Sequence, residues 1–196
     1  MQRILFILTA ILTPSLAVAH AGEGVAGGLV SGLLHPVLGP DHLVAMVAVG
    51  LWGAQLGRPL LILLPLAFPL VMALGGVMGL ADLPLPGVEI GIALSALILG
   101  LVVAMAFRAP VWLAVVLVGV FAVFHGFAHG KELPEAASPI AYGIGFMLAT
   151  GMLHLAGIAI GLLNDWKELG PRIVRGCGAA IALLGLVFLG GALGLT

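Results

Sequence analysis

Apolar segments long enough to cross a lipid bilayer dominate this chain. A helix needs about 20 residues, at a rise of about 1.5 Å per residue, to cross a hydrocarbon core about 30 Å thick. Six segments reach or exceed that length, and short connections that carry Pro, Gly or charge separate them. They run from about Val25 to Ala54, Leu60 to Leu80, Val88 to Phe107, Val111 to Gly130, Ile140 to Leu163 and Ile173 to Leu195. The sequence therefore predicts an all-α, polytopic membrane protein with six transmembrane helices.

The shortage of charge excludes other classes of protein. Only 8% of the 196 residues are charged, whereas a soluble domain carries about 25%. A net charge of -1, without a run of Lys or Arg, provides no surface for binding nucleic acid. Cys177 is the single cysteine, so no internal disulfide or CxxC site is expected. A bound metal would need nitrogen and oxygen ligands.

The amino terminus has the pattern of a secretory signal peptide. A basic start at Arg3 precedes an apolar run, and an A-x-A sequence ends at Ala19. An uncleaved anchor helix is the alternative, but a Pro-Ser break and the small residues before His20 favour cleavage. We therefore expect a signal peptide over 1–19 and one six-helix transmembrane domain over 20–196.

Basic residues predict how the chain is oriented. If the mature amino terminus lies outside, five basic residues fall on cytoplasmic loops and one on an outer loop, which follows the positive-inside rule. These are Arg58, Arg108, Lys167, Arg172 and Arg175 inside, and Lys131 outside. The outer loops carry Glu23, Asp82, Glu89, Glu132 and Glu135, so they would attract cations. We expect a multi-pass protein of the bacterial inner membrane with a periplasmic mature amino terminus.

Ionisable residues within the first apolar segment indicate a site at membrane depth. His35, Asp41 and His42 lie within eight residues, and an Asp at the centre of a transmembrane helix costs about 2.5–3.5 kcal/mol on insertion scales. Two prolines and a glycine should break the segment near Pro36 to Pro40. Transporters use such breaks to bind ions near the membrane midplane. The alternative is that Asp41 only caps the next helix and the histidines only bond to neighbouring helices.

A second group of ligand-type residues ends the fourth apolar segment. His125 and His129 are four residues apart, so on a helix they share one face and can reach one metal ion. Glu132 follows three residues later and can supply an oxygen ligand or orient a histidine. Alone, this pattern is weak, and the first group on another segment strengthens it.

Two more histidines complete the predicted set of metal ligands. His154 lies near mid-depth in the fifth segment. It could bind the metal or transfer a proton, and the alternative is that it only makes a structural hydrogen bond. His20 would present its ring and its free α-amino group to a divalent ion after cleavage. A histidine that merely follows the cleavage site is the alternative. Histidine and carboxylate ligands suit Ni²⁺, Co²⁺ or Zn²⁺.

These residues resemble the motifs of the HupE/UreJ family. The matching stretches are His35-Pro36-x-x-Gly39-x-Asp41-His42, Phe124-His125-Gly126-x-x-His129-Gly130-x-Glu132 and Thr150-Gly151-x-x-His154. The resemblance covers essentially the whole mature chain. It implies a small permease for nickel, in some relatives cobalt, that serves hydrogenase or urease maturation. It also implies that transport needs His35, Asp41, His42 and Glu132, with His125 and His129 in the second motif.

The expected function is secondary or facilitated uptake of Ni²⁺ or, next, Co²⁺, with the ion as substrate and no permanently bound cofactor. Expected partners are the ion, membrane lipid and the hydrogenase or urease maturation machinery, and the oligomeric state stays open. Protonation of the imidazoles should weaken binding, so uptake should fall as the pH drops through about 6.5. The competing class is a membrane-embedded hydrolase with a zinc ion bound by His and Asp, against which the sequence has no HExxH motif.

Overall fold

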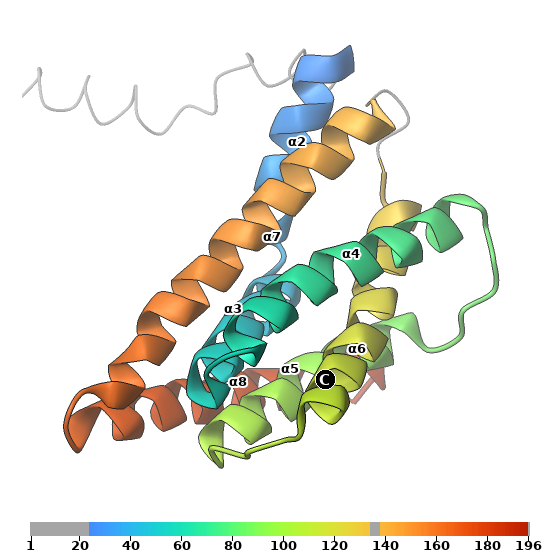
Figure 1. Cartoon of the computed structure of the whole chain (residues 1–196). Coiled ribbons are helices and arrows are strands. Elements are labelled where there is room, and N and C mark those ends of the chain that lie inside the picture. Colours follow the sequence, from blue (N-terminus) through green and yellow to red (C-terminus); the bar gives the residue numbers. More distant parts are fainter. Residues whose placement is uncertain (1–23, 134–137, 196) are drawn as a thin grey trace, which may run out of the picture.

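The computed structural model describes residues 24–133 and 138–195 (Figure 1). The predicted signal peptide over 1–19 and His20 therefore lie outside the described residues. Every regular element within the two ranges is helical, which confirms the all-α prediction. The elements are α2 (Gly24–Leu38), α3 (Pro40–Leu56), α4 (Leu60–Leu80), α5 (Val88–Ala104), α6 (Val111–Lys131), α7 (Pro139–Gly161), the 3-10 helix η2 (Leu162–Asp165) and α8 (Leu169–Ala192).

Several of these helices are long and apolar enough to cross a membrane. α4, α6, α8 and the run from Pro139 to Asp165 each qualify alone, and α2 and α3 qualify together as a bent pair. α5 is apolar but has 17 residues, fewer than the roughly 20 that a straight crossing needs. The described chain is a multi-pass membrane protein with four or five candidate spans, and the count of six stays a prediction.

The first apolar segment breaks inside the range that the sequence predicts. α2 and α3 meet at a bend of 78°, and Gly39 between them has an extended backbone. Pro40 follows as the first residue of α3, a position where the missing N–H has no helical partner to lose. Gly39 and not Asp41 occupies the N-cap position. Asp41 instead lies in the first turn, where its Oδ1 accepts the His42 N–H at 2.8 Å.

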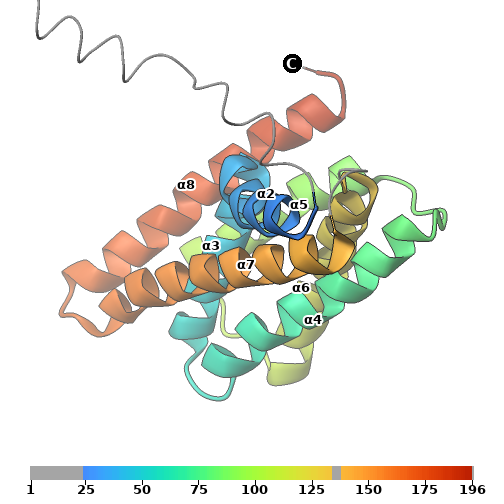
Figure 2. The same cartoon turned by 90° about the horizontal axis from the view of Figure 1, so that it is seen from above.

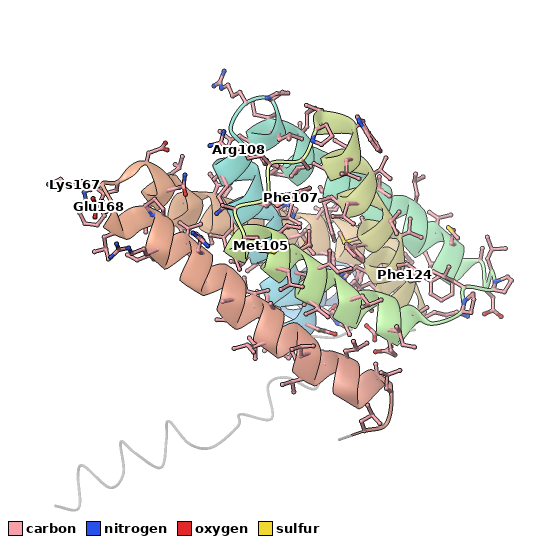
Figure 3. All side chains as sticks on the ribbon, turned by 90° about the horizontal axis from the view of Figure 1, so that it is seen from below. Met105, Phe107, Arg108, Phe124, Lys167 and Glu168 are labelled. Atoms are coloured by element: carbon pink, nitrogen blue, oxygen red, sulfur yellow. The ribbon has the colours of Figure 1, made fainter. Side chains whose placement is uncertain are left out.

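The end of α5 is held at one end of the molecule by two neighbouring helices. α5 stops at Ala104, three residues before the predicted Phe107, because Ala106 adopts a left-handed conformation with φ of 50°. The Trp52 indole of α3 donates to the Phe107 carbonyl at 3.0 Å, and Arg175 of α8 donates to the Ala104 carbonyl at 2.7 Å. The loops that carry Arg58, Arg108 and Lys167, all predicted to be cytoplasmic, therefore lie near this end of the molecule. Figure 3 labels Arg108 and Lys167 on two of these loops.

Close backbone contacts set the distances between helices. α4 packs on α6, α5 on α8, and α7 along both α2 and α3 (Figures 1 and 2). A Cβ added at Gly126 of α6 would overlap the Met72 carbonyl of α4, and one added at Gly32 of α2 would overlap the Tyr142 carbonyl of α7. Small residues permit such approach where lipid surrounds the helices. The pairing fixes α6 and α2 on either side of the site described next.

Candidate metal-binding site

Of the six predicted ligands that line one cavity of about 370 Å³, five belong to groups whose ligand atoms lie close enough to share a metal ion. They are His35 from the last turn of α2, His42 from the first turn of α3, and His125, His129 and Glu132 from the end of α6. Exposure decreases with depth. The side chains of Glu132 and His35 are 52% and 34% exposed, whereas His42 and His125 are buried. The break between α2 and α3 thus brings two histidines to the end of α6.

The more exposed residues form what we call the outer cluster: His35, His129 and Glu132. Oε2 of Glu132 lies 3.1 Å from His35 Nε2 and 3.3 Å from His129 Nδ1, and the two nitrogens are 3.1 Å apart. An ion about 2.0–2.1 Å from each ligand needs ligand atoms roughly 2.9–3.4 Å apart in octahedral or tetrahedral geometry. The outer cluster has the dimensions of a three-ligand metal site.

The deeper group is the inner cluster, which consists of the buried His42 and His125 and the partly buried His129. His42 Nδ1 lies 3.2 Å from His125 Nδ1 and 3.1 Å from His129 Nε2. All three ligand nitrogens lie within 4.8 Å of one another. The inner cluster therefore offers three imidazole nitrogens to one ion, and His129 belongs to both clusters.

Two buried hydroxyl groups hold the inner histidines. Ser95 Oγ of α5 donates to the Ile92 carbonyl at 2.6 Å, so it accepts the hydrogen of His125 Nε2 at 2.8 Å. That hydrogen bond leaves the lone pair on His125 Nδ1, which faces the cluster. Thr150 Oγ1 of α7 lies 3.3 Å from His42 Nε2. Metal-binding histidines are commonly oriented by such a bond from the other ring nitrogen.

The carboxylate of the outer cluster is kept ionised by its neighbours. Hydrogen bonds with His129 and then His35 hold the pKa of Glu132 at about 2, although partial burial opposes this shift. Glu132 follows the last residue of α6. A negative charge therefore stands beside the cavity mouth at any physiological pH and would attract a cation.

Comparison with known proteins places the chain in a family. The family model described as HupE / UreJ protein matches residues 8–188. The chain belongs to the HupE/UreJ family. It is also 44% identical over 184 residues to Protein HupE of Rhizobium leguminosarum bv. viciae, across 94% of this chain and 95% of that protein. No solved structure matches the chain. The sequence resemblance to the HupE/UreJ family is confirmed.

Two of the ligands predicted for this HupE/UreJ protein lie outside both clusters, and a third precedes the described residues. Asp41 lines the same cavity, but among the described residues it joins no group of metal-binding geometry. His154 of α7 is buried one turn beyond Thr150, and its ring stands edge-on to Phe68 at 5.6 Å between centroids. His20 falls before the first described residue. Ligation by these three residues stays a prediction.

Sequence reasoning missed three polar residues at the site of this HupE/UreJ member. Ser95 and Thr150 were not predicted to support ligands, and Glu89, which lines the cavity, was placed only in an acidic outer loop. One signal was available for Ser95, since it is the only hydroxyl-bearing residue in α5. A lone hydroxyl in an apolar helix often has a partner on a neighbouring helix.

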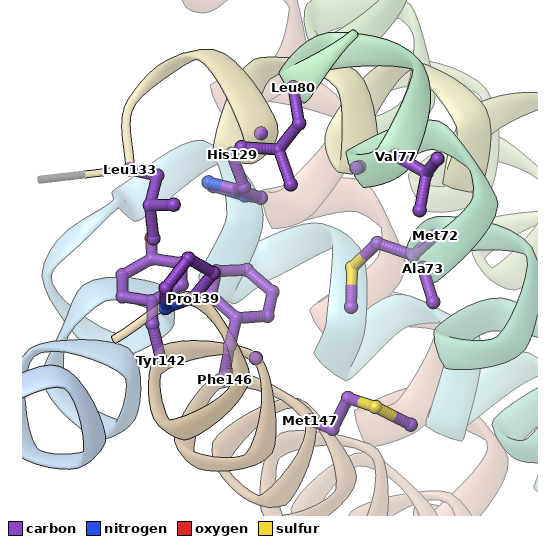
Figure 4. A pocket seen from close by; sticks show the side chains of 14 residues that line it. Met72, Ala73, Val77, Leu80, His129, Leu133, Pro139, Tyr142, Phe146 and Met147 are labelled. Carbon is purple, nitrogen blue, oxygen red and sulfur yellow. The ribbon is translucent and has the colours of Figure 1, made fainter. Parts of the chain in front are cut away.

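A second cavity also borders His129. It measures about 240 Å³ and lies between α4, α6 and α7. Figure 4 shows His129 at its edge, beside Tyr142 and Phe146 and across from Met72. The Phe146 ring packs on His129 at 4.3 Å between centroids. This apolar lining suits hydrocarbon, whereas histidines and carboxylates line the first cavity.

Proposed function

We propose that the protein carries a divalent transition-metal ion, Ni²⁺ first and Co²⁺ next, into the cell across the inner membrane. The inner cluster is the observation that carries this proposal. Its three histidines are held together inside a bundle of apolar helices, and ionisable groups at such depth are costly and usually functional. Membership of the HupE/UreJ family, which the sequence resemblance links to nickel and cobalt permeases, supports the same conclusion.

The graded exposure of the ligands supports uptake from the outer face. The ionised Glu132 and the cavity-lining Glu89 and Asp41 would raise the local concentration of cations. An ion would first meet the outer cluster and then the buried inner cluster. The bend between α2 and α3 resembles the discontinuous helices at which transporters bind ions. We therefore propose secondary or facilitated transport, with a periplasmic mature amino terminus.

The ligand chemistry supports the choice of ion. Imidazole nitrogens with one carboxylate oxygen suit Ni²⁺, Co²⁺ and Zn²⁺, among which geometry and availability decide. Hydrated divalent ions could exchange water for three protein ligands at each cluster. By its family resemblance, we further propose that the imported metal supplies hydrogenase or urease maturation.

The alternative of a membrane-embedded hydrolase gains no support from the two clusters. The Ser95 hydroxyl beside His125 is fully buried and donates to a backbone carbonyl, so it is not poised as a nucleophile. The Glu132 carboxylate is already engaged with His35 and His129. Turnover of lipid or peptide by the purified protein would be needed to support the hydrolase alternative.

Accumulation of radioactive nickel and cobalt by cells that express the chain tests this function. The His42→Ala and Asp41→Ala variants should accumulate far less metal than the parent at equal protein level. Glu168→Gln is the matched control, because Glu168 lies exposed in the turn before α8 (Figure 3). If His42→Ala accumulates as much of both metals as the parent, the proposed function is wrong.

A further inference from the structure

The two clusters use different atoms of the one residue that they share. His129 Nδ1 faces the outer cluster, 3.1 Å from His35 Nε2 and 3.3 Å from Glu132 Oε2. His129 Nε2 faces the inner cluster, 3.1 Å from His42 Nδ1. The His129 ring therefore stands between the two clusters and presents one nitrogen to each.

A neutral imidazole has only one nitrogen lone pair available in the ring plane, because its other nitrogen carries hydrogen. An ion in the outer cluster would take the lone pair of Nδ1, and the hydrogen on Nε2 would then point at His42 Nδ1. An ion in the inner cluster would take the lone pair of Nε2, and the hydrogen on Nδ1 would then be donated to the Glu132 carboxylate. Each occupied state thus provides His129 with a hydrogen-bond acceptor on the side that the ion leaves empty.

We propose that the outer and inner clusters are alternative positions of a single ion, and that His129 prevents both from being filled at once. This inference rests on the proposed function, since it concerns the transported ion. Passage inward moves one hydrogen of the His129 ring from Nε2 to Nδ1. Water in the open cavity accepts one proton and returns one, so the ring releases none overall.

The other inner ligands do not share this ambiguity. Ser95 already holds the hydrogen of His125 on Nε2, so Nδ1 of His125 is free for the ion whichever position the ion takes. His42 meets Thr150 through Nε2 and the cluster through Nδ1. His129 is consequently the ligand whose state must change when the ion moves.

Equilibrium dialysis of the full chain in detergent micelles against Co²⁺ or Ni²⁺ tests the proposal by stoichiometry. All samples carry His20→Ala, so that the predicted amino-terminal site does not add to the count. One ion per chain at saturation is the expected result. Two ions per chain would overturn the proposal, because His129 would then bridge them after losing both hydrogens. Binding of no ion would contradict the proposed function itself, which distinguishes the two failures.

Single substitutions separate the two positions. His35→Ala removes a ligand of the outer cluster only, and His125→Ala removes one of the inner cluster only. Each variant should still bind one Co²⁺ ion, with a visible spectrum that differs between the two because only the outer cluster contains a carboxylate. The combined variant should lose binding, and Glu168→Gln should match the parent. If either single variant elutes from a sizing column as the parent does yet binds no ion, the clusters form one site and the proposal is wrong.

Discussion

Glu132 supplies the only negative charge within the two clusters, and its low pKa determines how acid affects it. A carboxylate with a folded-state pKa of about 2 stays ionised until the pH falls far below neutrality. The stabilisation that its hydrogen bonds give the folded state is complete above the ordinary pKa of about 4.5 and is lost as the pH drops towards about 2. Protonation of Glu132 should therefore not limit binding of a metal ion between pH 5 and 8.

Replacing this carboxylate should weaken binding of the metal ion at each pH between 5 and 8. Glu132→Gln removes a charged ligand of similar size, and a charged hydrogen-bonding group contributes about 1.5–3 kcal/mol, so affinity for Co²⁺ should fall roughly ten- to hundredfold. Titrations of the parent and of Glu132→Gln with Co²⁺ between pH 5 and 8 should show weaker binding by the variant. Equal affinities of the two proteins across this range would contradict the role of the carboxylate as a ligand. Glu168→Gln should match the parent throughout.

Ser95 orients His125, so its removal should weaken binding of the ion at the proposed metal site. Ser95→Ala leaves the His125 Nε2–H without its acceptor at 2.8 Å, and losing such a partner typically costs a metal site about 10- to 100-fold in affinity. The lost buried hydrogen bond should also lower stability by about 1 kcal/mol. Co²⁺ titration and thermal unfolding in detergent measure the two effects. Ser31→Ala is the control, since within the described part of the chain the Ser31 hydroxyl bonds only to its own helix. Equal metal affinities of the two variants would disprove the role of Ser95.

At the scale of elements, the break in the first segment determines whether two histidines can reach His129. His35 and His42 both contact that residue, at 3.1 Å each. In a continuous helix, seven residues at about 1.5 Å each would separate them by roughly 10 Å along the axis. The bend of 78° therefore lets both histidines contact His129, which a straight helix would not allow.

Straightening this segment should abolish the site. The double substitution Gly39→Ala and Pro40→Ala favours a continuous helix by about 4 kcal/mol in intrinsic propensity and restores an amide donor. We expect the variant to fold but to lose nickel uptake and Co²⁺ binding. Pro69→Ala, in the interior of α4, is the matched control for removing a proline from an apolar helix. Parent-like binding by the double variant would show that the bend is dispensable.

Element boundaries show how far the sequence alone can go. The Pro and Gly residues predicted the break correctly because they act locally on the backbone. The start of α8 was predicted at Ile173 but lies at Leu169, since Pro171 falls in the first turn, where its missing N–H has no helical role. The end of α5 was misplaced because a non-glycine residue, Ala106, adopts the left-handed conformation there.

At the scale of the whole molecule, the packing of α4 on α6 positions the second motif. Gly126 lies between the two histidines of α6 and touches the α4 backbone. The sequence predicted which residues of α6 share a face, because helical periodicity is local. It did not predict that His129 would belong to two clusters or that Asp41 would belong to neither, because those relations depend on the angle between helices.

A methyl group at this contact should disturb both stability and binding. Gly126→Ala forces α6 away from the Met72 carbonyl, and overpacking of this kind costs about 1–3 kcal/mol. The melting temperature in detergent should fall, and Co²⁺ binding should weaken. Gly119→Ala on the same helix is the control, because a Cβ there meets nothing within 4 Å. A Gly126→Ala protein as stable as the control would contradict the close packing.

Uptake of radioactive Ni²⁺ into vesicles that contain the purified chain tests most directly whether the clusters carry an ion through the membrane. His129→Ala removes the one residue common to both clusters. We expect the parent to fill vesicles well above the protein-free level and His129→Ala to leave them at that level. Uptake by His129→Ala at the rate of the parent would contradict passage of the ion through these histidines.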